Sequence, residues 1–277
     1  MLKHSFCHLP GIGPKKEHRL WERGILTWED FLEPGNEPFV AEKVQEQQNR
    51  VRDSLRQLGQ NNAEYFAALL PRAEMWRLFR TFRDQTAYLD IETTGMGRGL
   101  DHITCIGLYD GREIQSFVHG RNLEAFADRI LDYKLLVTFN GSCFDLPFIE
   151  RELQIQLPAA HVDLRFLLKS LGYAGGLKSV EKQFDLDRGC LSGADGFLAV
   201  LLWERFQTTE DERFLETLLA YNAEDVINLE FLMTRAYTLK QAACPAALDD
   251  PAPEVLHPFP NPYTAHAAVL EPLWSRG

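Results

Sequence analysis

Two acidic residues, Asp90 and Glu92, stand two positions apart within residues 87–94. Successive side chains of a β-strand point to opposite faces, so a strand here places Leu89 and Ile91 on one face and both carboxylates on the other. Asp and Glu are depleted in strands, although a half-buried strand with a solvated polar face also explains one such pair. Two carboxylates side by side raise the question of a functional site, which this pair alone does not answer.

A third carboxylate, Asp145, follows a predicted strand and an Asn140–Gly141 turn, just before a predicted helix. With Pro147 in the first helical turn, Asp145 has the position of a helix N-cap. The apolar residues on either side of it indicate instead that the chain turns into the core here. Both interpretations, a helix cap and a buried carboxylate, stay open at this point.

A fourth carboxylate, Asp225, interrupts an apolar stripe on the last long predicted helix. Members of this stripe recur every three or four residues: Phe214, Leu218, Tyr221, Asp225, Leu229 and Leu232. Burying an unpaired carboxylate is costly, so Asp225 requires a cation or a fixed donor as its partner. Tyr221, one turn earlier on the same face, would lie close to that partner. Alternatively, an Arg or Lys pairs with Asp225, or Tyr221 bonds to it directly.

The elements that must position these residues are visible in the periodicity of the chain. Alternating and β-branched segments predict strands at 86–91, 103–109, 113–118 and 135–139, with a short strand ending at Asp163. Helical patterns predict helices at 123–130, 147–153, 164–171, 177–184, 196–206 and 211–237. We therefore expect an α/β fold with a mixed sheet flanked by helices, in which Asp163 caps the helix that follows it.

The chain divides into three regions. Residues 1–83 are predicted to be helical, with a capping box at Thr27 and a long amphipathic helix whose apolar stripe runs from Val40 to Leu58. Residues 84–242 form the α/β domain, and residues 243–277 form a tail with seven of the 14 prolines, expected to be extended on the surface or partly disordered. The net charge of −11 argues against broad attraction to nucleic acid, although residues 1–83 alone carry a net charge of +2.

A glycine-rich turn near the start, Gly11-Ile12-Gly13, is followed by Lys15 and Lys16. It resembles the hairpin of a helix-hairpin-helix module, whose backbone N–H groups approach a phosphate at a helix N-terminus. Too few residues precede Gly11 for the first helix of that module. Phosphate binding and a plain capped turn are both open interpretations. Lys178 opens a later helix, where it would either meet a phosphate or lie in solvent.

Targeting and redox signals are few. The sequence has no apolar run of the roughly 20 residues that a membrane helix needs, and its start lacks the features of a signal peptide. We therefore expect a cytoplasmic protein without membrane contact.

The five cysteines contain no CxxC pair, which argues against a disulfide framework or a thiolate zinc site.

Taken in order, Asp90-x-Glu92, the stretch FNGSCFDLPF with Asn140 and Asp145, and Tyr221-x-x-x-Asp225 resemble the three motifs of DEDDy-type exonucleases of the ribonuclease H-like superfamily. The middle stretch is also similar to a motif of family B polymerase proofreading domains. The stretches YLDIETTG, GLKSVEKQF and YNAEDVINLEFL resemble YprB-type bacterial ribonuclease H-like proteins. The motifs cover about residues 86–237, and the YprB-type likeness extends to the N-terminus.

The resemblance implies that Asp90, Glu92, Asp145 and Asp225 hold two Mg²⁺ or Mn²⁺ ions and, with Tyr221, catalyse phosphodiester hydrolysis. In this scheme, Tyr221 orients the attacking water or helps to deprotonate it. Residues 84–242 would then be an exonuclease domain that degrades DNA or RNA from a single-stranded 3′ end and releases nucleoside 5′-monophosphates.

The resemblance also leaves choices open. Asn140 and Lys178, together with the turn residues Gly11, Gly13, Lys15 and Lys16, are candidate nucleic-acid-binding residues. An endonuclease or structure-selective nuclease would use the same site. A non-catalytic nucleic-acid-binding protein could retain the same fold.

Overall fold

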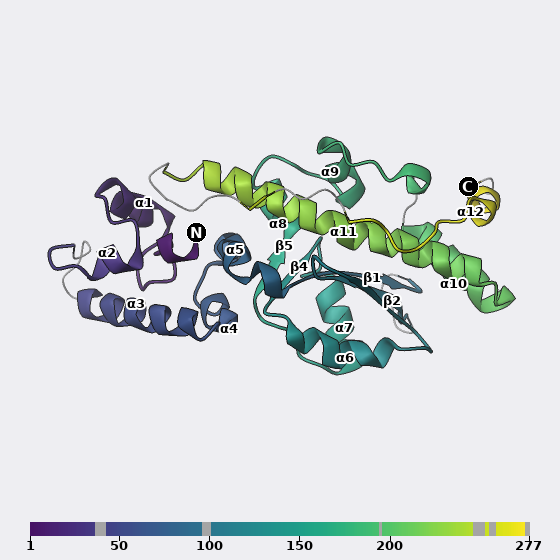
Figure 1. Cartoon of the computed structure of the whole chain (residues 1–277), viewed down its shortest axis with the longest axis horizontal. Helices are drawn as coiled ribbons and strands as arrows, with labels where there is room; N and C mark the ends of the chain where they lie inside the picture. Colours follow the sequence, from purple (N-terminus) through teal and green to yellow (C-terminus); the bar gives the residue numbers. More distant parts are fainter. Residues whose placement is uncertain (37–42, 96–100, 194–195, 246–252, 255–258, 275–277) are drawn as a thin grey trace.

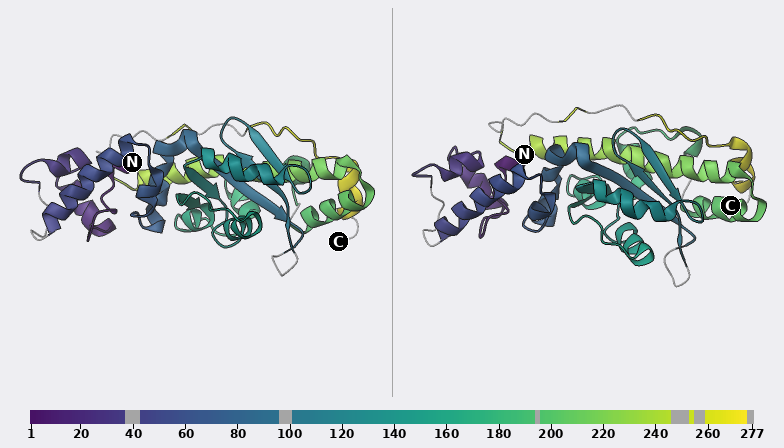
Figure 2. Two further views of the ribbon diagram at one scale, coloured as in Figure 1. Left: turned by 90° about the horizontal axis from the view of Figure 1, so that it is seen from below. Right: turned by 60° about the horizontal axis from the view of Figure 1, so that its bottom comes forward.

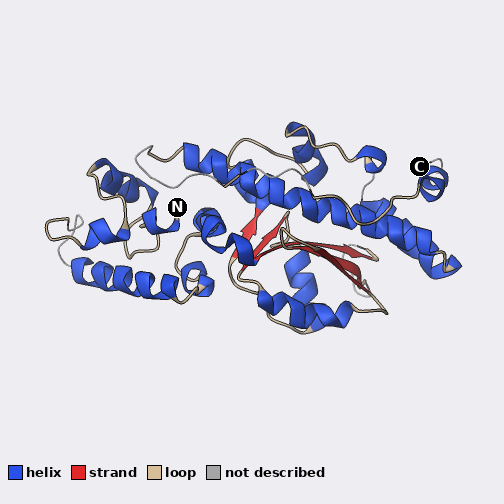
Figure 3. Ribbon diagram, in the orientation of Figure 1, coloured by secondary structure: helices blue, strands red, loops and turns tan. Residues whose placement is uncertain are grey.

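The computed structural model describes residues 1–36, 43–95, 101–193, 196–245, 253–254 and 259–274. Its centre is a five-stranded mixed sheet in the order β3-β2-β1-β4-β5 (Figures 1 and 3). The strands are β1 (Thr86–Thr93), β2 (Ile103–Tyr109), β3 (Ile114–Val118), β4 (Leu135–Thr138) and β5 (His161–Asp163). The first three strands are antiparallel neighbours, whereas β4 and β5 run parallel to β1. The predicted mixed sheet flanked by helices is confirmed.

Helices surround this sheet. The N-terminal segment, residues 1–83, contains η1 (Leu2–His4), α1 (Pro14–Glu22), α2 (Trp28–Leu32), α3 (Val44–Gly59), α4 (Ala63–Ala67), η3 (Arg72–Leu78) and α5 (Phe79–Phe82), and η4 (Arg83–Gln85) leads into β1. Thr27 and Asp30 form the predicted capping box at the start of α2. Val40, the first residue of the predicted stripe on the long helix, lies outside the described residues.

The later helices alternate with the strands or follow them. They are η5 (Leu123–Ala125), α6 (Phe126–Arg129), η6 (Ile130–Asp132), α7 (Asp145–Leu153), α8 (Leu164–Lys169), α9 (Leu177–Gln183), η7 (Gly189–Leu191), α10 (Gly196–Thr209), α11 (Glu212–Ala242) and α12 (Ala267–Trp274). Within the described part of the chain, no helix is long and apolar enough to cross a membrane.

The sheet is covered on both faces, by α11 on one side and by α6 and α7 on the other (Figure 1). Leu89 and Ile91 of β1 belong to the apolar cluster that contains Phe126 and Ile149 of the latter helices. Tyr88, which points the opposite way, belongs to the cluster that includes residues of α11. The even-numbered positions of β1, including Asp90 and Glu92, therefore face α11.

The C-terminal tail differs from the sequence prediction. Residues 246–252 and 255–258 lie outside the described residues, but residues 267–274 form α12, so an extended tail is the wrong description of that part. The reason is that Val269 and Leu270 are buried and complete an apolar cluster with Trp203 and Leu219 of α10 and α11. Figure 2 shows α12 and the N-terminal helices at opposite ends of the molecule.

A buried ion pair organises the N-terminal segment. Arg77 of η3 donates from Nη1 and Nη2 to the two carboxylate oxygens of Glu17 in α1, each at 2.8 Å. Glu17 Oε1 also accepts from the backbone N–H groups of Phe6 and Cys7. Both side chains are almost fully buried, so the pair joins the chain start, α1 and η3 in one unit.

We predict that Arg77→Met lowers the free energy of unfolding by about 3–5 kcal/mol, because Glu17 is left as a buried charge without its counter-ion. Urea denaturation measures this loss. The control is Arg56→Met, which removes an exposed pair with Asp53 and should change stability by less than about 1 kcal/mol. Equal effects of the two substitutions would contradict the prediction.

Candidate active site

Three carboxylates meet where α11 crosses β1. Asp90 and Glu92 come from β1, Asp225 comes from α11, and one oxygen of each lies within 4.8 Å of the others. Asp90 is half-buried, while Glu92 and Asp225 are 9% and 5% exposed. Such a group of hard oxygen atoms fits a divalent cation such as Mg²⁺ or Mn²⁺.

Asp145, the fourth predicted ligand, lies beside this group but is not one of its three members. It is the first residue of α7, whose N-cap is Phe144, and no side-chain hydrogen bond caps the helix. The helix-cap interpretation of Asp145 is therefore wrong. Its Oδ1 instead accepts from the backbone N–H of Ile91 at 3.2 Å, so the carboxylate lies against β1 between the two predicted ligands of that strand.

The electrostatics of the four carboxylates are those of a site that needs positive charge. Burial raises the pKa of Asp90 and of Glu92 well above the usual range, and the Asp225 and Asp145 carboxylates raise both further. Burial also raises the pKa of Asp145, from 3.8 to about 7. Because each charge disfavours the others, full ionisation requires a compensating cation.

Two basic side chains reach the carboxylates. Arg188, in the loop between α9 and α10, forms an ion pair with Asp225. Lys178, on α9, donates from Nζ to Tyr221 Oη at 2.5 Å, and its charge lowers the pKa of Glu92. The alternative in which an Arg pairs with Asp225 is thus present in the structure. Arg188 was not predicted, because its only signal in the sequence is its place between the apolar residues Leu186 and Leu191.

Tyr221 lies one turn before Asp225 on α11 and is buried. Its hydroxyl accepts from Lys178. Burial, followed by the Asp225 and Glu92 charges, raises the pKa of Tyr221 strongly, so the phenol keeps its proton at neutral pH. The solvent-exposed interpretation of Lys178 is wrong, because its ammonium group also lies over the Tyr221 ring, 4.3 Å from the centroid.

Asn222 is a further residue of the site that the sequence did not predict. Its Nδ2 donates to Asp90 Oδ2 at 2.9 Å, and its side chain is fully buried. The strand residue opposite Asp90 is Gly107, where an added Cβ would collide with the Asn222 amide. The sequence around Asn222 does not indicate its contact with Asp90. That contact requires a glycine at position 107 on β2, which leaves room for the amide.

The loop that leads to Asp145 is held by Asp163. As predicted, Asp163 caps α8 by accepting from the Arg165 N–H. It also accepts from the backbone N–H groups of Asn140, at 2.8 Å, and Ser142. Asn140 has a positive φ of 68°, and its side-chain oxygen accepts from Arg165 Nη1 at 2.6 Å. Asn140 therefore lies on this loop at the carboxyl end of β4.

The remaining predicted residues lie in the N-terminal segment. Gly11 has a φ of 74°, and Gly13 is the N-cap of α1. Lys15 and Lys16 are exposed in the first turn of α1, and Lys16 Nζ donates to the Gly11 carbonyl at 2.8 Å. The structure thus separates the predicted residues into the carboxylate group with Tyr221 and Lys178, the Asn140 loop, and this turn.

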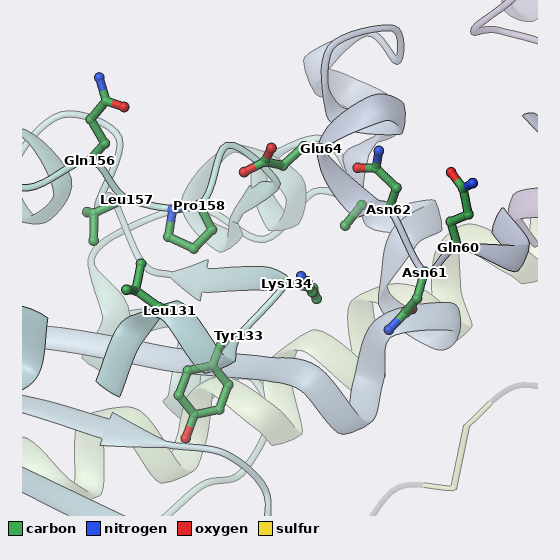
Figure 4. A pocket seen from close by; sticks show the side chains of 11 residues that line it. Gln60, Asn61, Asn62, Glu64, Leu131, Tyr133, Lys134, Gln156, Leu157 and Pro158 are labelled. Atoms are coloured by element: carbon green, nitrogen blue, oxygen red, sulfur yellow. The ribbon is translucent and has the colours of Figure 1, made fainter. Parts of the chain in front are cut away.

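A cavity of about 600 Å³ lies elsewhere, at the amino ends of β4 and β5 (Figure 4). It is lined by Gln60, Asn61, Asn62, Ala63, Glu64, Leu131, Tyr133, Lys134, Gln156, Leu157 and Pro158. None of the four carboxylates contributes to it, so the cavity and the acidic group are different features.

Comparison with known proteins agrees with this architecture. The model of the RNase_H superfamily matches residues 87–237, and the chain belongs to this superfamily. Among solved structures, the chain is similar to the Nibbler EXO domain of Aedes aegypti, with 12% sequence identity and a TM-score of 0.40 over 62% of this chain and 87% of that one. No curated protein matches the chain. Superfamily membership and the buried acidic group support a nuclease.

The raised pKa of Asp145 predicts how Asp145→Asn changes stability with pH in the absence of divalent ions. Ionising a group whose pKa is higher in the folded state destabilises that state, so the contribution of Asp145 is lost as pH rises from about 4 to about 7. Asn cannot ionise and still accepts from Ile91. We expect the variant to gain stability relative to the parent, by on the order of 1.4 kcal/mol per pH unit in this range.

Urea denaturation in EDTA between pH 4 and 8 measures the difference. Asp128→Asn, which changes an exposed carboxylate on α6, is the control and should follow the parent. Parallel pH profiles for the parent and Asp145→Asn would contradict the prediction.

Proposed function

We propose that this protein is a DEDDy-type 3′–5′ exonuclease that hydrolyses phosphodiester bonds with two Mg²⁺ or Mn²⁺ ions held by Asp90, Glu92, Asp145 and Asp225. The observation that carries the proposal is the convergence of three of these carboxylates at one point, with the fourth beside them. Two such ions, when bound, would activate a water and stabilise charge on the attacking and leaving oxygens.

The side chains around the carboxylates support specific roles. Because Lys178 donates to Tyr221 Oη, that oxygen already has a donor, and the phenol proton remains to be donated to another acceptor. With its pKa raised, Tyr221 serves better as a hydrogen-bond donor that orients the attacking water than as a base. Asn222 would keep Asp90 in place through its amide.

Substrate binding is a separate part of the proposal. The substrate would be DNA or RNA with a single-stranded 3′ end, and the products would be nucleoside 5′-monophosphates. Lys178 beside Tyr221, Asn140 on the loop that precedes Asp145, and Gly11, Gly13, Lys15 and Lys16 at the N-terminal turn are the proposed nucleic-acid contacts. The cytoplasm is the proposed location.

One observation favours a second candidate. The Arg188–Asp225 ion pair already gives Asp225 a counter-charge, as a non-catalytic nucleic-acid-binding protein with the same fold would require. Intact carboxylates and a buried tyrosine beside them favour the nuclease, and an assay separates the two functions.

We predict that the protein shortens 5′-labelled single-stranded DNA or RNA to a ladder in Mn²⁺, and that EDTA or Asp225→Asn abolishes the ladder. Single- and double-stranded DNA and RNA are each tested on a denaturing gel. One internal product would indicate an endonuclease, and intact substrate would favour the binding protein.

If calorimetry shows that Asp145→Asn and Asp225→Asn both bind two Mn²⁺ ions as the parent does, the ligand assignment is wrong.

A further prediction concerns Tyr221→Phe, which removes only the hydroxyl. If that group orients the attacking water, kcat falls by about 10²- to 10⁴-fold, the usual range for a positioned acid–base group, while Mn²⁺ affinity stays near the parent value. Single-turnover cleavage and the melting temperature are measured on the same preparation. Full turnover per folded molecule in a destabilised variant would show that the hydroxyl only satisfies Lys178.

A further inference from the structure

The buried side chain of Arg188 links α9 to α11. Its side chain is 5% exposed, and it lies in the loop between α9 and α10, whose Leu191 is buried among residues of α10 and α11. Within the described residues, this guanidinium is held by two acidic side chains, Glu181 of α9 and Asp225 of α11.

Glu181 fixes the orientation of Arg188. Its two oxygens accept from Arg188 Nε at 2.6 Å and from Nη2 at 2.5 Å, which is the two-bond geometry that makes an Arg–carboxylate pair directional. Glu181 is itself fixed, because its Oε1 also accepts from Asn228 Nδ2 at 2.9 Å. Asn228 lies three residues after Asp225 on α11, so the network begins and ends on the same helix.

The same network reaches the candidate metal ligand. Arg188 Nη2, which donates to Glu181, also forms the ion pair with Asp225 Oδ1. The third guanidinium nitrogen, Nη1, and Asp225 Oδ1 are both buried without a hydrogen-bond partner in the described part of the chain, so charge attraction joins Arg188 to Asp225. Buried polar groups are normally satisfied, and these two atoms are exceptions beside the carboxylates.

We propose that Arg188 is a positioning residue, which holds the Asp225 carboxylate in the orientation required to share a cation with Asp90 and Glu92. This inference rests on the proposed function. Glu181 and Asn228 act through Arg188 by preventing it from rotating. Partners of this kind, which orient a metal ligand without touching the metal, typically change metal affinity or activity by 10–100-fold when they are altered.

Arg188→Lys is the decisive variant, because it keeps the positive charge beside Asp225 and removes the two-bond geometry. The matched control is Arg77→Lys, which changes a second buried two-bond Arg–Glu pair among the described residues, within the N-terminal segment. Both variants should melt at lower temperature than the parent. Only Arg188→Lys should weaken Mn²⁺ binding in the calorimeter, by about 10- to 100-fold.

Glu181→Gln serves as the second variant, in case Arg188→Lys does not fold. It frees Arg188 from one side and should also weaken Mn²⁺ binding while leaving KM for the nucleic acid near the parent value. Parent-like or tighter Mn²⁺ binding in the folded variant would overturn the positioning role, since Arg188 would then be a structural tie or a competitor of the cation. If the parent itself binds no Mn²⁺, the proposed function fails as well, which distinguishes the two failures.

Discussion

The burial of several carboxylates between β1 and α11 is the constraint on which the rest of this structure depends. Like charges in a water-poor environment repel one another and resist ionisation, so the fold must either neutralise them or supply positive charge. The chain does both in part. Asn222 donates to Asp90, Ile91 donates to Asp145, and Arg188 pairs with Asp225. These contacts come from four different parts of the chain, which means that the site forms only when the whole domain is folded.

Sheet topology explains why these parts meet. Because β4 is parallel to β1 and adjacent to it, the loop after β4 emerges at the end of the sheet where β1 carries Glu92, and Asp145 follows within the same loop and helix start. Asp163, at the end of β5, holds this loop through its backbone N–H groups. On the face of the sheet that α11 covers, the helix can lie close to β2 because Gly107 has no side chain. Asn222 of α11 fills the space beside this glycine. The glycine on β2 and the Asn222 amide on α11 therefore fit each other, because any side chain at position 107 would collide with that amide.

Periodicity was enough to predict the strands, the long helix and the face on which Asp90 and Glu92 lie, because these depend on the local alternation of apolar residues. The apolar stripe around Asp225 also correctly indicated that this carboxylate needs a partner. It could not identify Arg188, since a loop residue has no periodic pattern and its contact with α11 is set by the fold. The cap interpretation of Asp145, one of the two left open by the sequence, failed for a related reason: local sequence is compatible with a cap, but the carboxylate accepts from the β1 backbone instead. In the tail, the high proline content favoured an extended chain in the prediction. Val269 and Leu270 of α12 are instead buried against an apolar surface of α10 and α11.

Charge also limits how a polyanion could reach the site. Residues 84–277 carry the whole acidic excess of the chain, so the carboxylate group repels phosphate until cations are bound. Two arginines have their charge offset within the protein: Arg77 is buried against Glu17, and the partly exposed Arg83 is paired with Glu230. Under the proposed function, divalent ions therefore do more than chemistry, because they reverse the sign of the local field before a phosphate can approach. Affinity for nucleic acid should then depend on the metal site itself, and the exposed lysines of the N-terminal turn would add to it only where the strand is long enough to reach both.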